Sequence, residues 1–390
     1  MNILYLHTSV LSDWDVTETL KKLDCNVKEF TAPLGMVEQD EKYVAELFSN
    51  IEQYHIDAVM SLRYFPIVSI ACNAMKIKYV SWVCVSYEPG LYSCTMLNKC
   101  NYVFLTDYSL FQEFTSNDFP HIFYLPLAAN VDRIRSIVEK NENTEEYLSD
   151  VTMLQDIVTR ESMFYNPLSP ESPLKDATKG YLEGCIACQH QISGLPSMAE
   201  HLPSYVWKDL TSNFIPNIGP DSIETPTHYY DYYYFNSLIT YADRDIHLNA
   251  LAKNEHFEKI NLYNNCRSYR SDNIQCYQRV DYLSELPAVI TQSKINLAVT
   301  HRNWRSGIPQ ISWDIMASGG FLLSNVQDDF LRLFPDCVPV MYTEERELLS
   351  KAIYYLHHEK ERQNLTARLL EEVTLKHTLK KRLEIIFSNV

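Results

Sequence analysis

Residues 294–333 carry the residue types and spacing that point most clearly to chemistry. They read as a buried strand, a polar loop, a helix and a second strand. Cations, a helix carboxylate and small residues gather along this unit: His301, Arg302, Arg305, Gly307, Asp314, Gly319 and Gly320. A helix carboxylate accepts hydrogen bonds from ribose hydroxyls, whereas loop arginines and a helix N-terminus hold a diphosphate. The unit therefore predicts a nucleotide site, with Asn325 after the second strand as a further contact.

Each of these residues also has a purely structural interpretation. An exposed loop arginine is usually a solvated charge, and a Gly-Gly pair usually forms only a turn. Nearer the N-terminus, His7 follows the first expected strand and is a candidate catalytic base, with a packed or hydrogen-bonded histidine as the alternative. Asp13 and Asp15 are also candidate bases, although helix capping explains both more simply.

Two runs of alternating strands and helices are expected to position these residues. Before residue 130, six strands separated by helices predict a parallel sheet: 2–7, 27–30, 58–62, 79–84, 102–106 and 122–127. After residue 256 four more strands are expected: 260–263, 295–300, 321–324 and 338–342. The stretch between them is dominated by helical periodicity, although residues 151–154 also have the character of a strand.

This rhythm predicts an α/β protein with two Rossmann-like domains facing each other across a cleft. We expect an N-terminal domain at 1–130, a connecting, largely helical insertion at 131–256, and a C-terminal domain with terminal helices at 257–390. Open α/β sheets bind ligands at the carboxyl ends of their strands, so the site residues should lie in loops that follow strands. The aromatic run at 228–235 is expected to pack into a core or cleft, with a sugar-stacking surface as the alternative.

Composition excludes several classes of function. The 390 residues include 50 acidic and 34 basic side chains, for a formal net charge of −16, and no dense basic run, so we expect no nucleic-acid partner. We expect neither a signal peptide nor a membrane span, because the apolar runs are too short. Ten scattered cysteines are typical of reduced thiols in a cytoplasmic protein. Cys185 and Cys188 form a C-x-x-C motif near His190 and His201, and we interpret them as buried thiols on a helix rather than as zinc ligands. No metal or cofactor is therefore expected.

Two parts of the chain also look familiar. The sequence SGIPQISWDIMASGGFLLSN, with SKINLAVTHR before it and YTEERELLSKAIYYLHHEKERQNL after it, resembles the C-terminal half of the CgeB-like (spore maturation protein-like) glycosyltransferases. The stretches YFPIVSIACNAMKIKYVSWV, LYSCTMLNKCNYVFLTD and FYLPLAANVDR are similar to the N-terminal domain of the same family. The resemblance covers most of residues 50–135 and 290–388.

The resemblance implies a GT-B fold and a metal-independent transferase that moves a sugar from a nucleotide-diphosphate donor to a protein or glycan acceptor. Asp314 matches the acidic residue that holds the ribose in related enzymes, and Gly307 matches the glycine before Ile-Pro. Gly319 and Gly320 match the small-residue turn under the donor. Arg302 matches a basic residue of the family loop, where it is a candidate catalytic group because the departing diphosphate gains negative charge.

Three positions depart from the family pattern. Gln310 stands where the family often has arginine, residues 154–156 replace a Gly-Ser pair, and residues 85–89 replace an Asp-Ser-Pro. Without the glycine loop a phosphate group is hindered from approaching the backbone closely. Without the arginine the leaving group lacks a stabilising charge. One alternative is therefore an inactive GT-B homologue that acts as a protein-binding partner or chaperone of an active transferase. A sugar- or nucleotide-binding protein without transfer activity is another.

Overall fold

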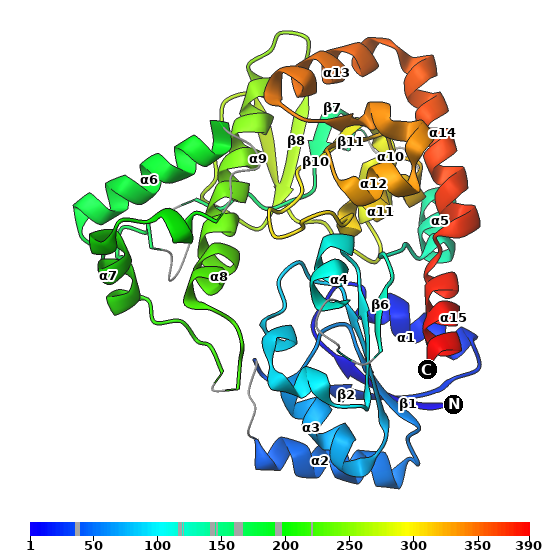
Figure 1. The fold of residues 1–390 in the computed structure, drawn as a ribbon. Coiled ribbons are helices and arrows are strands. Elements are labelled where there is room, and N and C mark those ends of the chain that lie inside the picture. The colour runs from blue at the N-terminus through cyan, green and yellow to red at the C-terminus, as the bar shows by residue number, and fades with distance from the viewer. Residues whose placement is uncertain are drawn as a thin grey trace.

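The computed structural model of the chain describes residues 1–35, 40–115, 119, 121–140, 145, 147–159, 167–191, 197–219 and 221–390. These residues form two α/β lobes and a helical insertion that extends to one side of them (Figure 1). Each lobe is built on a six-stranded sheet whose paired strands are all parallel.

The N-terminal lobe has the strand order β2-β1-β3-β4-β5-β6. Its strands are β1 (Asn2–His7), β2 (Asn26–Thr31), β3 (Ala58–Ser61), β4 (Lys78–Val83), β5 (Asn101–Leu105) and β6 (Ile122–Tyr124). Its helices are α1 (Asp13–Lys22), α2 (Glu41–Gln53), α3 (Pro66–Met75) and α4 (Tyr108–Thr115), with 3-10 turns at Pro89–Tyr92 and Cys94–Leu97. All six strands match the sequence prediction to within a few residues. The four inner strands, β1, β3, β4 and β5, were recognisable because strands covered on both faces read as short continuous apolar runs.

The C-terminal lobe has the strand order β12-β11-β10-β7-β8-β9. Its strands are β7 (Ser149–Met153), β8 (Ile260–Asn264), β9 (Ile274–Gln278), β10 (Ser293–Ala298), β11 (Leu322–Asn325) and β12 (Met341–Tyr342). Its helices are α5 (Val131–Lys140), α10 (Leu286–Gln292), α11 (Gln310–Ser318), α12 (Asp328–Leu333), α13 (Glu345–His357) and α14 (Glu359–Lys376), with a 3-10 segment at Pro335–Val340.

Two strands of this sheet differ from the sequence prediction. β7 lies at the centre of the sheet, between β10 and β8, so the C-terminal lobe takes a strand from the region expected to be a connection. β9 was not predicted, because it is an edge strand in which only Ile274 is fully buried and no continuous apolar run forms. The C-terminal lobe is therefore assembled from two separate parts of the chain.

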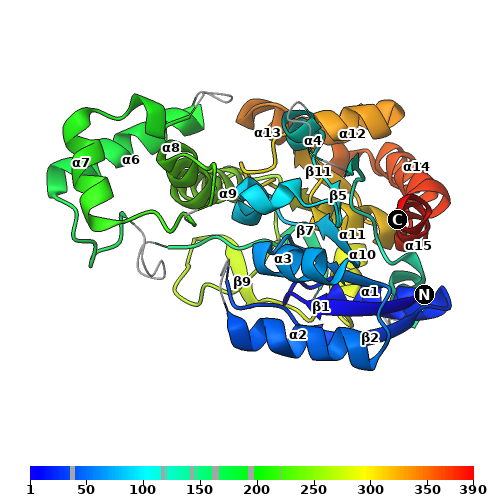
Figure 2. The ribbon, with the colours of Figure 1, turned by 60° about the horizontal axis from the view of Figure 1, so that its bottom comes forward.

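The insertion contains α6 (Asp176–Gln191), α7 (Ser204–Asn213), α8 (Pro226–Tyr230), the π-helical segment Asp231–Phe235 and α9 (Asn236–Ala252). Helices α6 to α8 project away from both sheets (Figure 2). They have a small hydrophobic core of their own that includes Leu182, Leu210 and Tyr230. α9 leads from this core into the C-terminal lobe, where Leu248 and Leu251 join the main core.

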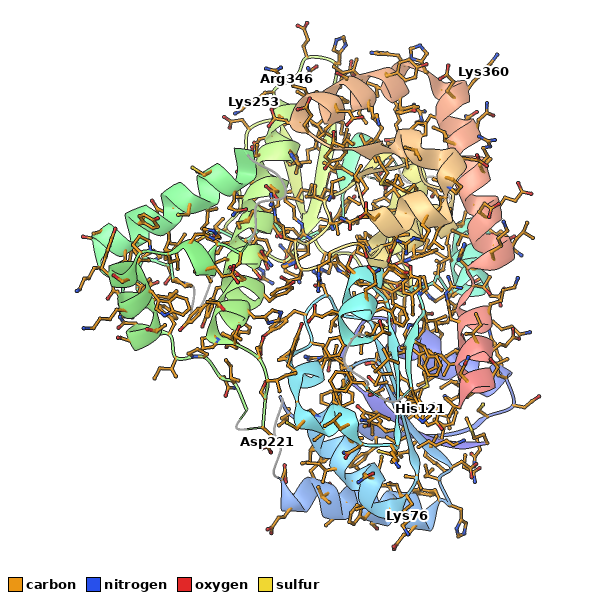
Figure 3. All side chains as sticks on the ribbon, in the orientation of Figure 1. Lys76, His121, Asp221, Lys253, Arg346 and Lys360 are labelled. Atoms are coloured by element: carbon orange, nitrogen blue, oxygen red, sulfur yellow. The ribbon has the colours of Figure 1, made fainter. Side chains whose placement is uncertain are left out.

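Side chains of both lobes extend into the space between the two sheets (Figure 3). One continuous apolar core includes Trp82 of the N-terminal sheet and Trp313 of α11, so the two lobes share buried contacts. The last helix, α15 (Leu379–Asn389), follows α14 and packs against α1, beside the N-terminal lobe (Figure 1). No helix in the described part of the chain is both long and apolar enough to cross a membrane.

Candidate functional site

A cavity of about 210 Å³ lies between the lobes, at the edge where strands of both sheets end. The N-terminal lobe lines it with Val10, Leu11, Ser12 and Cys84, and the C-terminal lobe with Leu154, Tyr263, Arg279, Val280, Tyr282, Leu286, Gln310, Ile311 and Asp314. We call it the interlobe cavity. It combines a mostly apolar wall with a few polar groups, which is the usual composition of a small-molecule site.

Helix α11 presents its N-terminal end and one acidic side chain to the interlobe cavity. Gln310 and Ile311 begin the helix, and the N-terminus of a helix attracts negative charge. Asp314 lies one turn further on and is only 2% exposed. Its carboxyl accepts hydrogen bonds from Gln310 Nε2 at 3.0 Å and from the Tyr282 hydroxyl at 3.4 Å. Burial raises the pKa of Asp314 to about 7, so near neutral pH the group has both protonation states.

A buried ion pair next to this wall joins α1 to α5. Arg133 donates to both carboxylate oxygens of Asp15, from Nε at 2.7 Å and from Nη2 at 2.9 Å, and also to the carbonyls of Tyr282 and Leu283. Asp15 therefore does not cap α1. Asp13 does bind backbone amides, those of Thr8 and Val10, within the turn that precedes the helix.

The loop between β10 and α11 is held by a carboxylate from the other lobe. Asp107, which follows β5, accepts from the amides of Arg305, Ser306 and Gly307 at 2.7, 2.9 and 3.0 Å and from the Ser306 hydroxyl at 2.9 Å. A Cβ at Gly307 would lie 2.7 Å from the Trp304 ring, so only glycine fits. Converging amides of this kind form anion sites in proteins. In this protein the anion that these amides bind is the Asp107 carboxylate of the N-terminal lobe.

A carboxylate of the C-terminal lobe likewise binds an amide of the N-terminal lobe. Asp329 of α12 accepts from the amide of Tyr108, and the amide of Ser109 donates to the Ser306 hydroxyl. We call the contacts of Asp107, Ser306 and Asp329 the interlobe clasp. The clasp joins the start of α4 to the start of α12 and fixes the loop that was predicted to hold a diphosphate.

The two loop arginines are each paired with a carboxylate. Arg302 turns towards the insertion, where its Nε donates to Asp243 on α9 at 2.8 Å and its amide donates to the Thr240 hydroxyl. Arg305 forms an ion pair with Glu113 of α4, across the lobe boundary. Neither arginine is among the residues that line the interlobe cavity. The structure thus brings only Asp314, of the predicted site residues, to the cavity wall.

The remaining predicted residues have identifiable structural surroundings. Gly319 ends α11 in the left-handed conformation, with φ of 75°, and a Cβ at Gly320 would lie 2.4 Å from Ile290. The Asn325 side chain accepts from the amide of Thr300 at 2.7 Å and so shapes the start of the loop. At the end of β1, His7 Nε2 lies 2.7 Å from the Glu29 carboxylate on β2, away from the cavity wall.

The segment that replaces the family's Gly-Ser pair is tied to the neighbouring strand. Gln155 accepts from the Val299 amide at 2.7 Å and donates to the Val299 carbonyl at 3.1 Å. Arg244 braces the same point by donating to the carbonyls of Val299 and Asp156, and burial lowers the pKa of this guanidinium to about 10. A buried side chain therefore occupies the place where a glycine would leave room for a ligand.

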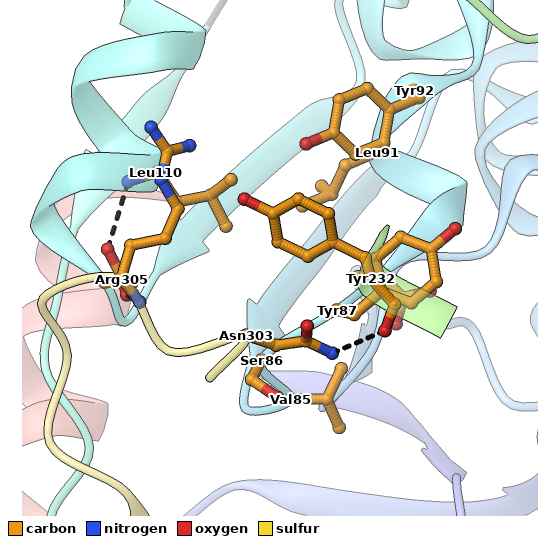
Figure 4. Close-up of a pocket in the computed structure, with 11 residues that line it drawn as sticks. Val85, Ser86, Tyr87, Leu91, Tyr92, Leu110, Tyr232, Asn303 and Arg305 are labelled. Carbon is orange, nitrogen blue, oxygen red and sulfur yellow. Dashed lines mark hydrogen bonds between the residues drawn. The ribbon is translucent and has the colours of Figure 1, made fainter. Parts of the chain in front are cut away.

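A second, narrower pocket lies beside the interlobe clasp (Figure 4). The rings of Tyr87, Tyr92 and Tyr232 gather on one side of it and Arg305 lies on the other, with Asn303 below them. The sequence singled out the aromatic run at 228–235 but did not connect it with Tyr87 or Tyr92. That connection depends on the insertion folding back onto the N-terminal lobe, which local sequence patterns do not encode.

The structure describes both cysteines of the C-x-x-C motif but not every histidine side chain near them. Cys185 and Cys188 lie on α6 as free thiols, and the side chain of His190 is outside the described residues. Across the residues that the structure describes, no group of three or more His, Cys, Asp or Glu side chains is placed to hold a metal ion.

Comparison with known proteins identifies the architecture. A sequence profile described as glycosyl transferase-like matches residues 244–388. In three dimensions the chain is similar to a glycosyltransferase from Rickettsia africae, with a TM-score of 0.56, 11% identity, and coverage of 100% of this chain and 98% of the other. It is also similar to HepE from Anabaena, solved in complex with UDP-glucose, with a TM-score of 0.51, 10% identity and the same coverage. The chain has a GT-B fold. Its C-terminal half contains a glycosyl transferase-like domain, and no curated protein matches the sequence.

Replacing Asp107 with asparagine should weaken the association of the two lobes. The amide keeps the shape of the side chain but loses the charge, and its NH₂ group then faces backbone donors. We expect a loss of about 2–4 kcal/mol in the free energy of unfolding, measured by urea denaturation. The matched control is Asp272→Asn, at an exposed loop position, which should change stability by less than about 0.5 kcal/mol. Equal stabilities for the two variants would contradict the role given to the clasp.

Asp314→Asn should change how stability depends on pH. The pKa of Asp314 is about 7 in the folded protein, above its ordinary value, so the folded state holds a proton that the unfolded chain releases. Its stabilising contribution is present at acidic pH and is lost as pH rises towards and through 7. The variant retains the acceptor oxygen without the ionisation, so its stability relative to wild type should rise by roughly 1–3 kcal/mol between pH 5 and pH 8.5. A pH-independent difference in thermal midpoint between the two proteins would show that Asp314 is not protonated in this range.

Proposed function

We propose that the protein is a glycosyltransferase that moves a sugar from a nucleotide-diphosphate donor to a protein or glycan acceptor. The observation that supports this most directly is the interlobe cavity, because it lies where a GT-B fold leaves space between its sheets. The N-terminus of α11 and Asp314 both face it. In this proposal the donor nucleotide binds there, and Asp314 accepts hydrogen bonds from its ribose hydroxyls.

The reaction needs negative charge to be stabilised on the departing diphosphate. Among the cavity residues, Arg279 and the α11 N-terminus are the groups able to do this. Arg279 is already paired with Asp156, whose carboxylate also accepts from the Asn265 amide. We propose that the diphosphate competes with Asp156 for Arg279 and that no metal ion is required.

One observation favours a second candidate function. The amides of residues 305–307 are engaged by Asp107, and Arg302 and Arg305 are engaged by carboxylates. A GT-B module held in this state has fewer groups to offer a phosphate and would act as a binding partner of another protein, such as an active transferase. The two functions are separated by whether any nucleotide binds and whether any donor is cleaved.

Thermal stabilisation by nucleotides tests the donor site. UDP, GDP, dTDP and their glucose, N-acetylglucosamine or mannose conjugates would each be added at saturating concentration, since a ligand that binds only the folded state raises the unfolding midpoint. A ligand at one hundred times its Kd stabilises by about 2.7 kcal/mol. We expect at least one nucleotide to do so, and we expect Asp314→Ala to remove the increment.

The matched control for this measurement is Asp150→Asn. Asp150 lies at the opposite end of β7, where it binds Lys294 and two backbone amides. This variant should keep the full nucleotide-induced increment even if its own midpoint changes. If no nucleotide stabilises the wild-type protein, the donor proposal is wrong and the partner-binding function is favoured.

Cleavage of a donor separates a transferase from a binding protein. We expect the donor that binds most tightly to be hydrolysed slowly to free sugar and nucleoside diphosphate when no acceptor is present, with water taking the acceptor's place. The rate should be the same in excess EDTA, and free sugar would be measured by chromatography. Binding without any cleavage would favour the nucleotide-binding alternative, whereas a rate abolished by EDTA would overturn the metal-independent mechanism.

A further inference from the structure

A histidine on the insertion is oriented by a buried carboxylate. His228 Nδ1 lies 2.7 Å from Glu224 Oε1, and the Glu224 side chain is only 1% exposed. The hydroxyl of Tyr87 donates to the same oxygen at 2.6 Å. Burial, and then the charge of Glu224, raise the pKa of Tyr87 far above its usual value, so this hydroxyl remains a donor. The carboxylate is therefore fixed from two sides, and it orients the imidazole through Nδ1.

The other nitrogen of this ring is left available. Within the described part of the chain, His228 Nε2 has no hydrogen-bond partner, and the side chain is 23% exposed. A carboxylate bound to one imidazole nitrogen, with the second nitrogen open, is the arrangement of a general base. An i,i+4 pair at a helix start explains the contact between Glu224 and His228. This local pairing does not explain why Tyr87 of the N-terminal lobe binds the same carboxylate.

The imidazole is enclosed by aromatic rings from two parts of the molecule. It stacks on Tyr232 with a centroid distance of 4.2 Å, and its centroid lies 4.6 Å from Tyr92 and 6.1 Å from Tyr87. These three tyrosines line the narrow pocket of Figure 4, opposite Arg305, whereas His228 packs against them and is not itself among the residues that line the pocket. Beyond the rings, Tyr92 donates to Glu113, which is also the partner of Arg305. The titratable groups around the histidine are therefore Glu224 and the three phenols, with the Glu113–Arg305 pair behind them.

The pocket and the interlobe cavity lie at the same edge of the N-terminal sheet. Cys84, at the end of β4, lines the cavity, while the next residues along the chain, Val85 to Tyr87, line the pocket. On the C-terminal lobe, the β10–α11 segment supplies Arg305 to the pocket and Gln310 to the cavity. A donor in the cavity and an acceptor in the pocket would thus be held by adjoining segments of both lobes.

We propose that the pocket is the acceptor site and that His228 is the catalytic base of the transfer, an inference that rests on the proposed glycosyltransferase function. His228 Nε2 takes the proton of an acceptor hydroxyl as its oxygen forms a bond to the anomeric carbon of the donor sugar. The bond from that carbon to the diphosphate oxygen breaks, and its electron pair leaves with the nucleoside diphosphate. Glu224 holds the ring in position and stabilises the imidazolium that forms.

The chemistry of the pocket fits a carbohydrate hydroxyl. Aromatic faces pack against the C–H faces of a pyranose, and Arg305, Asn303 and Ser86 offer donors and acceptors for its hydroxyls. The space between the side chains is about 10 Å³, which holds about one water molecule. A sugar therefore enters only when Tyr87 and Tyr232 move apart, and Tyr232 belongs to the π-helical segment of the insertion.

The test compares His228→Gln and Glu224→Gln with wild type in donor cleavage. UDP-glucose, UDP-N-acetylglucosamine, GDP-mannose and dTDP-glucose would be assayed with and without methyl glucoside, maltose and N-acetylglucosamine as acceptors. For His228→Gln we expect kcat to fall by about 10²- to 10⁴-fold, with the donor KM changed less than twofold. The acidic limb of the kcat profile should disappear, because it reports protonation of the base. Glu224→Gln should lower kcat less and retain that limb.

The matched control is His358→Gln. His358 stacks on Tyr354 at 3.8 Å and uses Nδ1 for a hydrogen bond, but its partner is a backbone carbonyl. It lies between the end of α13 and the start of α14, two residues before Lys360, which Figure 3 shows at the end of the C-terminal lobe that is away from the N-terminal lobe. This variant should keep the wild-type kcat and pH profile. Thermal midpoints and the nucleotide-induced increment show whether each variant is folded.

The outcomes distinguish this inference from the proposed function. If wild type binds and cleaves a donor while His228→Gln keeps its kcat and acidic limb, the role of His228 is wrong and the transferase stands. Loss of the donor-induced stabilisation in His228→Gln would instead make it a structural residue. If wild type neither binds nor cleaves any donor, the proposed function fails and this inference fails with it.

Discussion

The carboxylate of Asp107 is the contact on which the relation between the two lobes depends. It belongs to the N-terminal lobe, yet three amides and a hydroxyl of the C-terminal lobe bind it. Hydrogen bonds to a charged acceptor are among the stronger contacts in a protein, and these are buried. Because they fix the loop before α11, they also fix where that helix points and therefore where Asp314 meets the interlobe cavity.

The same contact determines the electrostatics of the site. A GT-B fold that binds a doubly charged diphosphate would be expected to keep unpaired cations near its helix termini. In this protein Arg302, Arg305 and Arg133 are all matched with carboxylates. The wall of the interlobe cavity is correspondingly mostly apolar. Under the proposed function, donor affinity would come from the nucleoside, the α11 N-terminus and Arg279, rather than from a cluster of positive charge.

The sequence predicts the framework well and the site only in part. Parallel strands buried on both faces leave a local signal, and ten of the twelve strands in the described part of the chain were expected, together with the two-lobed α/β class. Asp314, which lines the interlobe cavity, was singled out because a helix carboxylate after a strand–loop unit is also a local pattern. The partners of Arg302 and Arg305 come from distant segments, at Asp243 and Glu113, and the Tyr87 hydroxyl that binds Glu224 beside His228 comes from the N-terminal lobe. No spacing rule reveals such pairs, and they determine whether each charge is available to a ligand.

The insertion contacts both lobes, so the lobes are joined through it as well as directly to each other. Near its tip, the amide of Ile223 binds the Tyr92 carbonyl of the N-terminal lobe at 2.7 Å. Further along, Asn303 of the C-terminal lobe binds the Tyr232 carbonyl at 2.9 Å. Because the insertion binds both lobes, one lobe can rotate against the other only if the insertion or its contacts change. The π-helical turn at Asp231–Phe235 lies between the Ile223 contact and α9, so the insertion connects the two lobes at a place separate from the clasp.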